Sequence, residues 1–153
     1  MGPYAQIELP VSIYEAWDRL FGVSGTKYWL LNRSGSLAPG ATISLVMGDA
    51  SGVVDMSVDT VVQPGQEPPS FLPYVTYRLH RQAWGCDVFG RLWLEPAGWG
   101  RSLLQVFHMN WEGLPGDLQL SERKLLCGYW AECARRALQY ICMPQARSAP
   151  HNW

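Results

Sequence analysis

Between residues 41 and 111 the hydrophobic and polar positions alternate with a period of two, which is typical of half-buried β-strands. Turn-forming residues, chiefly Gly, Pro and Asp, separate the alternating stretches. Short loops between consecutive strands favour antiparallel pairing. The pattern therefore predicts an antiparallel sheet with strands over residues 41–47, 52–62, 74–81, 86–95 and 102–111.

Another strand and two short helices are predicted before this sheet. Residues 4–9 alternate in the same way, and Pro10 ends that strand. Ser12 with Glu15 three residues later resembles a capping box, which predicts a helix through Leu20. After a break at residues 22–25, a second short helix is expected over residues 26–31.

A long helix is predicted near the C-terminus, from Ser121 to about Ile141. Its apolar stripe consists of Leu126, Trp130, Ala134, Ala137 and Ile141. The apolar face of an antiparallel sheet needs a cover, and this helix is the candidate. We expect one α+β domain over residues 1–143 and a polar, disordered tail at 144–153.

Composition adds a reason to expect an internal site. The 153 residues are 48% hydrophobic and only 16% charged, and they include eight Trp and seven Tyr. Large aromatic side chains suit wide internal surfaces such as the lining of a ligand pocket. The net charge is −1, and the basic residues do not cluster into a stripe along the chain. Neither nucleic acid nor an anionic membrane is therefore an expected partner.

Several other functional classes lack their motifs. No apolar run approaches ~20 residues, so no membrane insertion is expected. The cysteines form no C-x-x-C pair and no metal-ligand spacing with a histidine, which predicts reduced thiols and no bound metal. No nucleotide-binding glycine loop or nucleophile elbow occurs, so no cofactor is expected. The N-terminus lacks the plan of a signal peptide, which favours a cytoplasmic location.

Three segments carry a resemblance to a known group. They are LPVSIYEAWDRLFGVSGTKYWL, GRLWLEPAGWGRSLLQVFHMNWEG and ERKLLCGYWAECARRALQYI. In this order they resemble the START/Bet v 1-like (SRPBCC) superfamily, in its branch of polyketide cyclases and activators of the Hsp90 ATPase. The resemblance implies a helix-grip fold, a curved antiparallel sheet wrapped around a long C-terminal helix. One departure is Asn110, where the branch usually has Gly.

The resemblance also indicates which strand faces point inward. The family's pattern places His108 inside, together with Leu104, Val106 and Asn110 of the last strand. The corresponding inward residues of the other strands are Val54, Met56, Val58, Val75, Tyr77, Leu79, Val88, Gly90, Leu92 and Leu94. The enclosed surface would then be mostly aliphatic, with His108, Asn110 and Tyr77 as its polar groups.

This composition suits a ligand site, in which a few polar groups orient an apolar molecule. The candidate catalytic residues are His108, Asn110 and Tyr77. The candidate ligand-binding residues, around a cavity on the order of a few hundred Å³, are Trp29, Val54, Met56, Leu92, Val106, Tyr129 and Trp130. His108 has two interpretations: a core residue bonded to backbone, or a proton donor or acceptor to a carbonyl or enol, a role that a pKa near 6.5 would suit.

The opposite parity defines the outer face of the sheet. Arg78, His80 and Arg91 are expected there as surface residues. Phe89, Trp93, Leu103 and Phe107 share this face, which is more apolar surface than scattered exposure gives. Phe89, Trp93 and Phe107 are therefore candidates for a homodimer interface, unless the two faces are reversed.

Three functions remain open at this stage. The first is a cyclase-like enzyme of polyketide-type biosynthesis that binds an apolar, carbonyl-bearing molecule and folds it into a reactive shape. The second is a non-catalytic carrier or sensor of a hydrophobic ligand. The third is an interaction module comparable to the chaperone-activating relatives. His108 and Asn110 favour the first, and an exposed aromatic patch favours the third.

Overall fold

The computed structural model describes residues 5–30, 37–46, 53–65, 72–81, 84–109, 114 and 116–143. Its strands are β1 (Ala5–Leu9), β2 (Thr42–Val46), β3 (Val53–Val62), β4 (Tyr74–His80), β5 (Val88–Pro96) and β6 (Ser102–Met109). Its helices are α1 (Ile13–Phe21), α2 (Val23–Trp29) and α3 (Gly116–Cys142). All of the predicted elements are present, in the predicted order.

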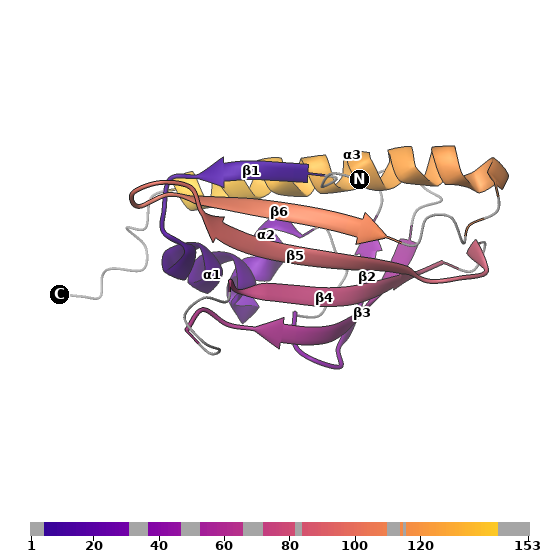
Figure 1. The fold of residues 1–153 in the computed structure, drawn as a ribbon, viewed down its shortest axis with the longest axis horizontal. Coiled ribbons are helices and arrows are strands. Elements are labelled where there is room, and N and C mark those ends of the chain that lie inside the picture. The colour runs from indigo at the N-terminus through magenta and orange to yellow at the C-terminus, as the bar shows by residue number, and fades with distance from the viewer. Residues whose placement is uncertain are drawn as a thin grey trace.

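The six strands form one curved sheet in the order β1-β6-β5-β4-β3-β2, and every neighbouring pair is antiparallel (Figure 1). Consecutive strands from β2 to β6 are neighbours because their connections are short, whereas β1 returns to the far edge beside β6. A register shift between Val58 and Thr60 interrupts the pairing of β3 with β4. Such a bulge increases the local bend and twist of a strand.

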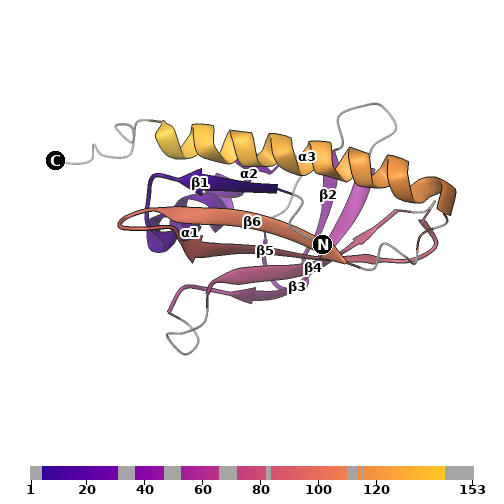
Figure 2. The same cartoon turned by 45° about the horizontal axis from the view of Figure 1, so that its top comes forward.

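Helix α3 runs along one face of this sheet, close to β1 (Figure 2). The predicted stripe is confirmed, because each of its members is buried: Leu126, Trp130, Ala134, Ala137 and Ile141. The predicted start at Ser121 is wrong, since the helix begins at Gly116. Ser121 lies within the helix.

The N-terminal helices support the sheet from its end. Ser12 caps α1 as predicted, its Oγ accepting a hydrogen bond from the Glu15 amide at 3.2 Å. The predicted break over residues 22–25 is wrong, because Gly22 alone separates α1 from α2. Gly25 is needed for close packing, since a Cβ there would lie 1.8 Å from the carbonyl oxygen of Arg19.

Two anchors hold α3 near its ends. The Arg19 guanidinium donates to the carbonyl oxygens of Tyr140 at 3.0 Å and Ile141 at 2.9 Å, which lie in the last turn, where carbonyls lack i+4 partners within the helix. Toward the other end, Glu122 accepts hydrogen bonds from Arg81 and from the Trp84 indole, both at 2.7 Å. The predicted start of the next strand at residue 86 differs from the structure, in which β5 begins at Val88.

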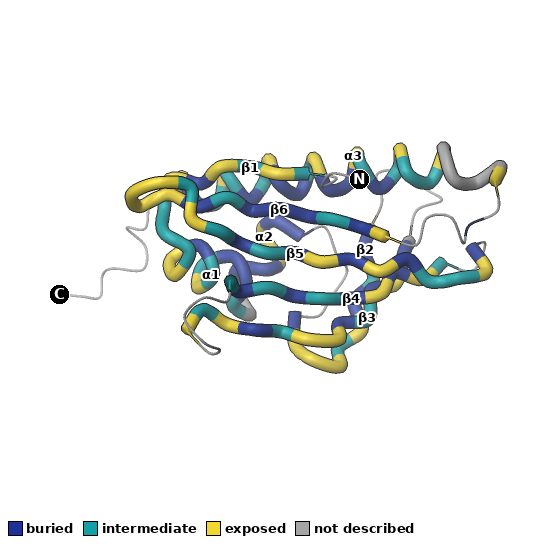
Figure 3. The backbone as a smooth tube through the Cα atoms, in the orientation of Figure 1, coloured by how far each residue is buried: buried dark blue, intermediate teal, exposed yellow. Residues whose placement is uncertain are grey.

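The two faces of the sheet are assigned as the sequence predicted. Burial alternates along β4 and β5, and the inward residues form one core with α3 (Figure 3). Arg78, His80 and Arg91 lie on the exposed face.

The cysteines at 86, 127, 133 and 142 are thiols, not disulfides. No helix within the described ranges is long and apolar enough to cross a membrane. The expected tail at 144–153 lies outside these ranges.

Candidate functional site

The centre of the concave face holds a hydrogen-bonded pair of polar side chains, Tyr77 and His108. They come from β4 and β6, the two neighbours of β5, and both face Gly90 in the strand register. The Tyr77 hydroxyl lies 2.8 Å from Nε2 of His108. Both residues are almost completely buried, with 1% and 0% of their surface exposed. The antiparallel register thus places two residues 31 positions apart on one line across the sheet.

Gly90 allows the two rings to meet. A Cβ at this position would lie 2.3 Å from Cε1 of Tyr77 and 2.5 Å from Cδ2 of His108, well inside van der Waals contact. A glycine within a strand often marks such a close approach. The sequence shows Gly90 as an inward residue, but its role becomes visible only when the register is known.

Trp130 of α3 covers the pair from the helix side. Its ring centroid lies 6.0 Å from that of Tyr77 and 5.9 Å from that of His108. Tyr129 packs edge-on against Trp130 at 4.9 Å. Four of the predicted site residues, Tyr77, His108, Tyr129 and Trp130, are therefore brought together as one aromatic cluster.

Burial keeps both members of the pair uncharged over the neutral pH range. It lowers the pKa of His108 to about 3, because an imidazolium there would lose its hydration. Burial also raises the pKa of Tyr77 well above its usual value, and the nearby Cys133 adds to the shift. The pKa near 6.5 that we expected for His108 is wrong for this environment. The pair can donate and accept hydrogen bonds at neutral pH, but His108 does not act there as a resident cation.

The aliphatic candidates belong to the same packed core. Val54, Met56, Leu92 and Val106 are each at most 3% exposed. Trp29 lies in this core too, but its indole donates to the Leu20 carbonyl at 2.7 Å and its ring contacts Phe21. An internal cavity among these residues stays a prediction. Asn110 lies outside the described residues.

The outer face carries the apolar residues that were predicted for it. Phe89 is 41% exposed and pairs in register with Met109, which is 54% exposed. Trp93 and Phe107 are half-buried. The Trp93 indole donates to Glu95 at 3.0 Å, and the Arg91 guanidinium lies 5.8 Å from its ring. The most exposed apolar part of this face is therefore around Phe89.

Within the described part of the chain, no three His, Cys, Asp or Glu side chains are placed to hold a metal ion.

A curved antiparallel sheet that grips a long C-terminal helix, with a polar pair enclosed between them, defines an α+β helix-grip protein. The chain has the Bet v 1-like helix-grip fold that the sequence resemblance implied. No protein-family model matches the sequence, and no curated protein matches it significantly. The fold is shown by solved structures of low sequence identity.

Three of these structures illustrate the range of proteins with this fold. DynU16, a protein of the dynemicin biosynthetic locus, is 21% identical with a TM-score of 0.62; the match covers 90% of this chain but only 45% of DynU16. Norcoclaurine synthase from Thalictrum flavum, in complex with dopamine and hydroxybenzaldehyde, is 10% identical with a TM-score of 0.62 over 90% and 83% of the two chains. The Aha1 dimer from Colwellia psychrerythraea is 18% identical with a TM-score of 0.55 over 82% and 87%.

Gly90→Ala tests the close approach of the two rings. The added methyl group cannot fit unless Tyr77 or His108 moves, so we expect a loss of roughly 1–3 kcal/mol in the free energy of unfolding, measured by urea denaturation. Gly128→Ala is the matched control, because nothing lies within 4 Å of a Cβ at that helical position. It should be neutral or stabilising by up to about 1 kcal/mol. Equal effects of the two substitutions would contradict the packing described.

The buried imidazole predicts a specific pH dependence of stability. Between pH 6.5 and about 3 the unfolded chain binds a proton at residue 108 that the folded protein does not. Stability should therefore fall as the pH drops below 6.5, by roughly 2 kcal/mol between pH 7 and pH 5. His108→Gln should remove this part of the slope in urea denaturation. His80→Gln, at an exposed histidine, should retain it, and equal slopes in both variants would exclude a buried neutral His108.

Proposed function

We propose that this protein binds an apolar, carbonyl-bearing small molecule between the sheet and α3, and acts on it as a cyclase-like enzyme of polyketide-type biosynthesis. The observation that carries the proposal is the buried Tyr77–His108 pair within an aliphatic and aromatic core. A few polar groups in an apolar enclosure are what an orienting site for such a ligand needs.

The neutral pair suggests how a carbonyl would be held. In the tautomer with a proton on Nε2, His108 donates to the Tyr77 oxygen, which leaves the Tyr77 hydroxyl proton for the ligand. The hydroxyl then donates to the carbonyl oxygen and stabilises the partial negative charge on that oxygen, which makes the carbonyl carbon more electrophilic. The surrounding apolar side chains hold the rest of the molecule in a folded conformation, which supplies the other part of the rate enhancement.

Access to this site requires movement. Trp130, Tyr77 and His108 are almost completely buried, so a ligand reaches the pair only when α3 or an adjoining segment shifts away from the sheet. Closure around the ligand would then exclude water from the reacting carbonyl, which strengthens each hydrogen bond to it.

Two structural neighbours support this proposal, one through its bound ligand and the other through the locus from which it comes. Norcoclaurine synthase, with the same fold, is in complex with hydroxybenzaldehyde, an aromatic carbonyl compound. DynU16 comes from a biosynthetic locus. A non-catalytic carrier would use the same enclosure without turnover, and measuring turnover on a candidate substrate separates the two roles.

A ketone-bearing naphthalene dye, whose emission depends on hydrogen bonding to its carbonyl, tests the site directly. We expect saturable binding of about one dye per chain. Tyr77→Phe should shift the emission to the blue and weaken binding roughly 3- to 10-fold, because one neutral hydrogen bond is lost. Tyr74→Phe, in the same strand but on the outer face, should change neither. On an identified substrate, Tyr77→Phe or His108→Gln should lower kcat by about 10²–10⁴.

Two results would contradict this proposal. One is dye emission that is the same in the wild type and in Tyr77→Phe. The other is loss of turnover in His108→Gln that is matched by loss of folded protein, which would make His108 a core residue only.

The exposed outer face favours a second role, association with another copy of the chain through Phe89, Trp93 and Phe107. The supporting observation is the adjacent exposure of Phe89 and Met109 on neighbouring strands. An exposed apolar patch on a sheet often marks an interaction surface. The similarity to the Aha1 dimer agrees with this proposal.

Substitution at the exposed centre of this face tests the association. Phe89→Glu introduces charge there and should convert a dimer into a monomer in sedimentation velocity, with Trp93→Glu giving the same result. Tyr14→Glu is the control, because Tyr14 is an exposed aromatic residue of α1. A wild type that sediments as a monomer at about 100 μM, well above the Kd of a stable interface, would exclude the dimer.

A further inference from the structure

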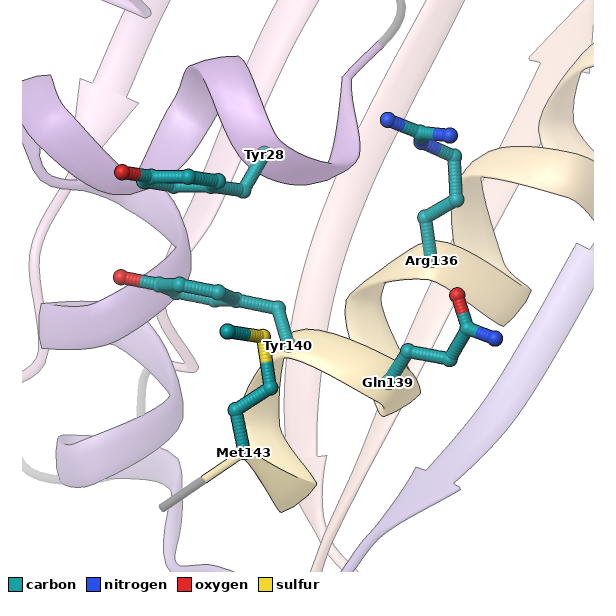
Figure 4. A pocket seen from close by; sticks show the side chains of 5 residues that line it. All are labelled: Tyr28, Arg136, Gln139, Tyr140 and Met143. Carbon is teal, nitrogen blue, oxygen red and sulfur yellow. The ribbon is translucent and has the colours of Figure 1, made fainter. Parts of the chain in front are cut away.

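A second site lies away from the buried pair, where α2 meets the C-terminal end of α3. Three residues of the last two turns of α3, Arg136, Gln139 and Tyr140, line a cleft together with Met143, which follows the helix, and Tyr28 of α2 (Figure 4). The volume of this cleft is about 120 Å³. The spacing of three and four residues places the three α3 residues on one face of the helix.

The aromatic wall of the cleft is held rigidly. The rings of Tyr28 and Tyr140 are stacked, with centroids 4.8 Å apart and an interplanar angle of 8°. Figure 4 shows the two parallel rings on one side and the side chains of Arg136 and Gln139 on the other. Arg19 fixes the backbone beneath Tyr140 through its two hydrogen bonds to α3 carbonyls. A ligand would therefore meet a preorganised surface.

Arg136 gives the cleft a positive charge and a buried donor. Its Nε is buried and has no hydrogen-bond partner. The hydrogen bond from Arg135, and to a smaller extent the charge of Arg136, lower the pKa of the nearby Glu132 carboxyl, so Glu132 is close to Arg136 but is hydrogen-bonded to Arg135. A buried donor left unsatisfied is unfavourable, so a ligand oxygen that accepts from Nε would stabilise it.

Two further cations lie beside the tyrosine rings of the cleft, although one of them, Arg19, is also paired with Glu15 at 3.5 Å. The Arg19 guanidinium lies 5.5 Å from the centroid of the Tyr140 ring, and the Lys27 ammonium lies 5.3 Å from that of Tyr28. None of the five lining residues is acidic. The cleft therefore favours an anion, and its tyrosine and methionine surfaces favour an apolar group attached to that anion.

We infer that this cleft binds a small aromatic or short apolar carboxylate. Its carboxylate pairs with the guanidinium of Arg136 and accepts a hydrogen bond from the Gln139 amide, while its apolar end contacts Tyr140 and Met143. The available volume is close to that of cavities, about 150 Å³, that enclose a single benzene ring. This site is separate from the proposed internal site and does not depend on it.

Benzoate is the probe for this site, and benzamide is its neutral counterpart of the same shape. In calorimetric titration of the full chain we expect one benzoate to bind with a Kd of about 1 mM or tighter. Benzamide should bind at least tenfold more weakly, because it lacks the charge. In NMR spectra the Nε–H resonance of Arg136 should shift as benzoate is added.

Two cationic residues of α3 provide a matched comparison. Arg136→Gln should weaken benzoate binding at least tenfold, whereas Lys124→Gln, which removes the same charge from an exposed position three turns earlier in the helix, should change it less than twofold. Tyr77→Phe should leave it unchanged, which separates this test from that of the internal site. Benzoate binding that is equal in Arg136→Gln and wild type, or equal to that of benzamide, would overturn the inference. An unmoved Arg136 Nε–H resonance at saturating benzoate would overturn it even if the variant failed to fold.

Discussion

The alignment of Tyr77, Gly90 and His108 across three neighbouring strands is the constraint on which the centre of this protein depends. Two large polar side chains share the space above a glycine, and their hydrogen bond satisfies groups that have no access to water. If the register of β5 slipped by one residue, Arg91 or Phe89 would face inward between the rings. The hydrogen bond and the strand register therefore support each other.

Helix α3 completes this arrangement because it is held along its length. Its apolar stripe packs on the sheet, and Trp130 closes over the polar pair. Arg19 satisfies two carbonyls near its C-terminal end, and Glu122 ties an earlier turn to the segment before β5. These anchors set where the helix lies against the sheet, and hence whether a ligand can enter between them.

The two proposed sites differ in the charge of their polar side chains. The internal pair is neutral, because removal from water suppresses both the imidazolium and the phenolate. The cleft at the end of α3 keeps a charge, because a guanidinium stays protonated even when it is partly buried. A neutral hydrogen-bonding pair suits a carbonyl group, and a guanidinium suits a carboxylate. The two proposed sites would therefore select different ligands because their local environments differ.

The sequence pattern by itself determined the elements and their order, and the resemblance to a known family indicated the inward face of each strand. A period of two and a helical stripe are imposed by burial on one side, so they are visible without coordinates. The resemblance of three segments indicated the helix-grip fold and placed His108, Tyr77, Tyr129 and Trp130 among the site residues. The start of α3 was misjudged, because Ser121 is compatible with both a cap and a helix interior.

Only the tertiary structure decided the properties that depend on distant neighbours. The pKa of His108 follows from its complete burial, and the role of Gly90 follows from two rings contributed by other strands. The cleft beside Arg136 needs Tyr28 from a helix more than a hundred residues earlier. Periodicity indicates that one side of an element is buried, but it does not indicate which residues of other elements pack against that side. Those neighbouring residues determine the chemistry of a site.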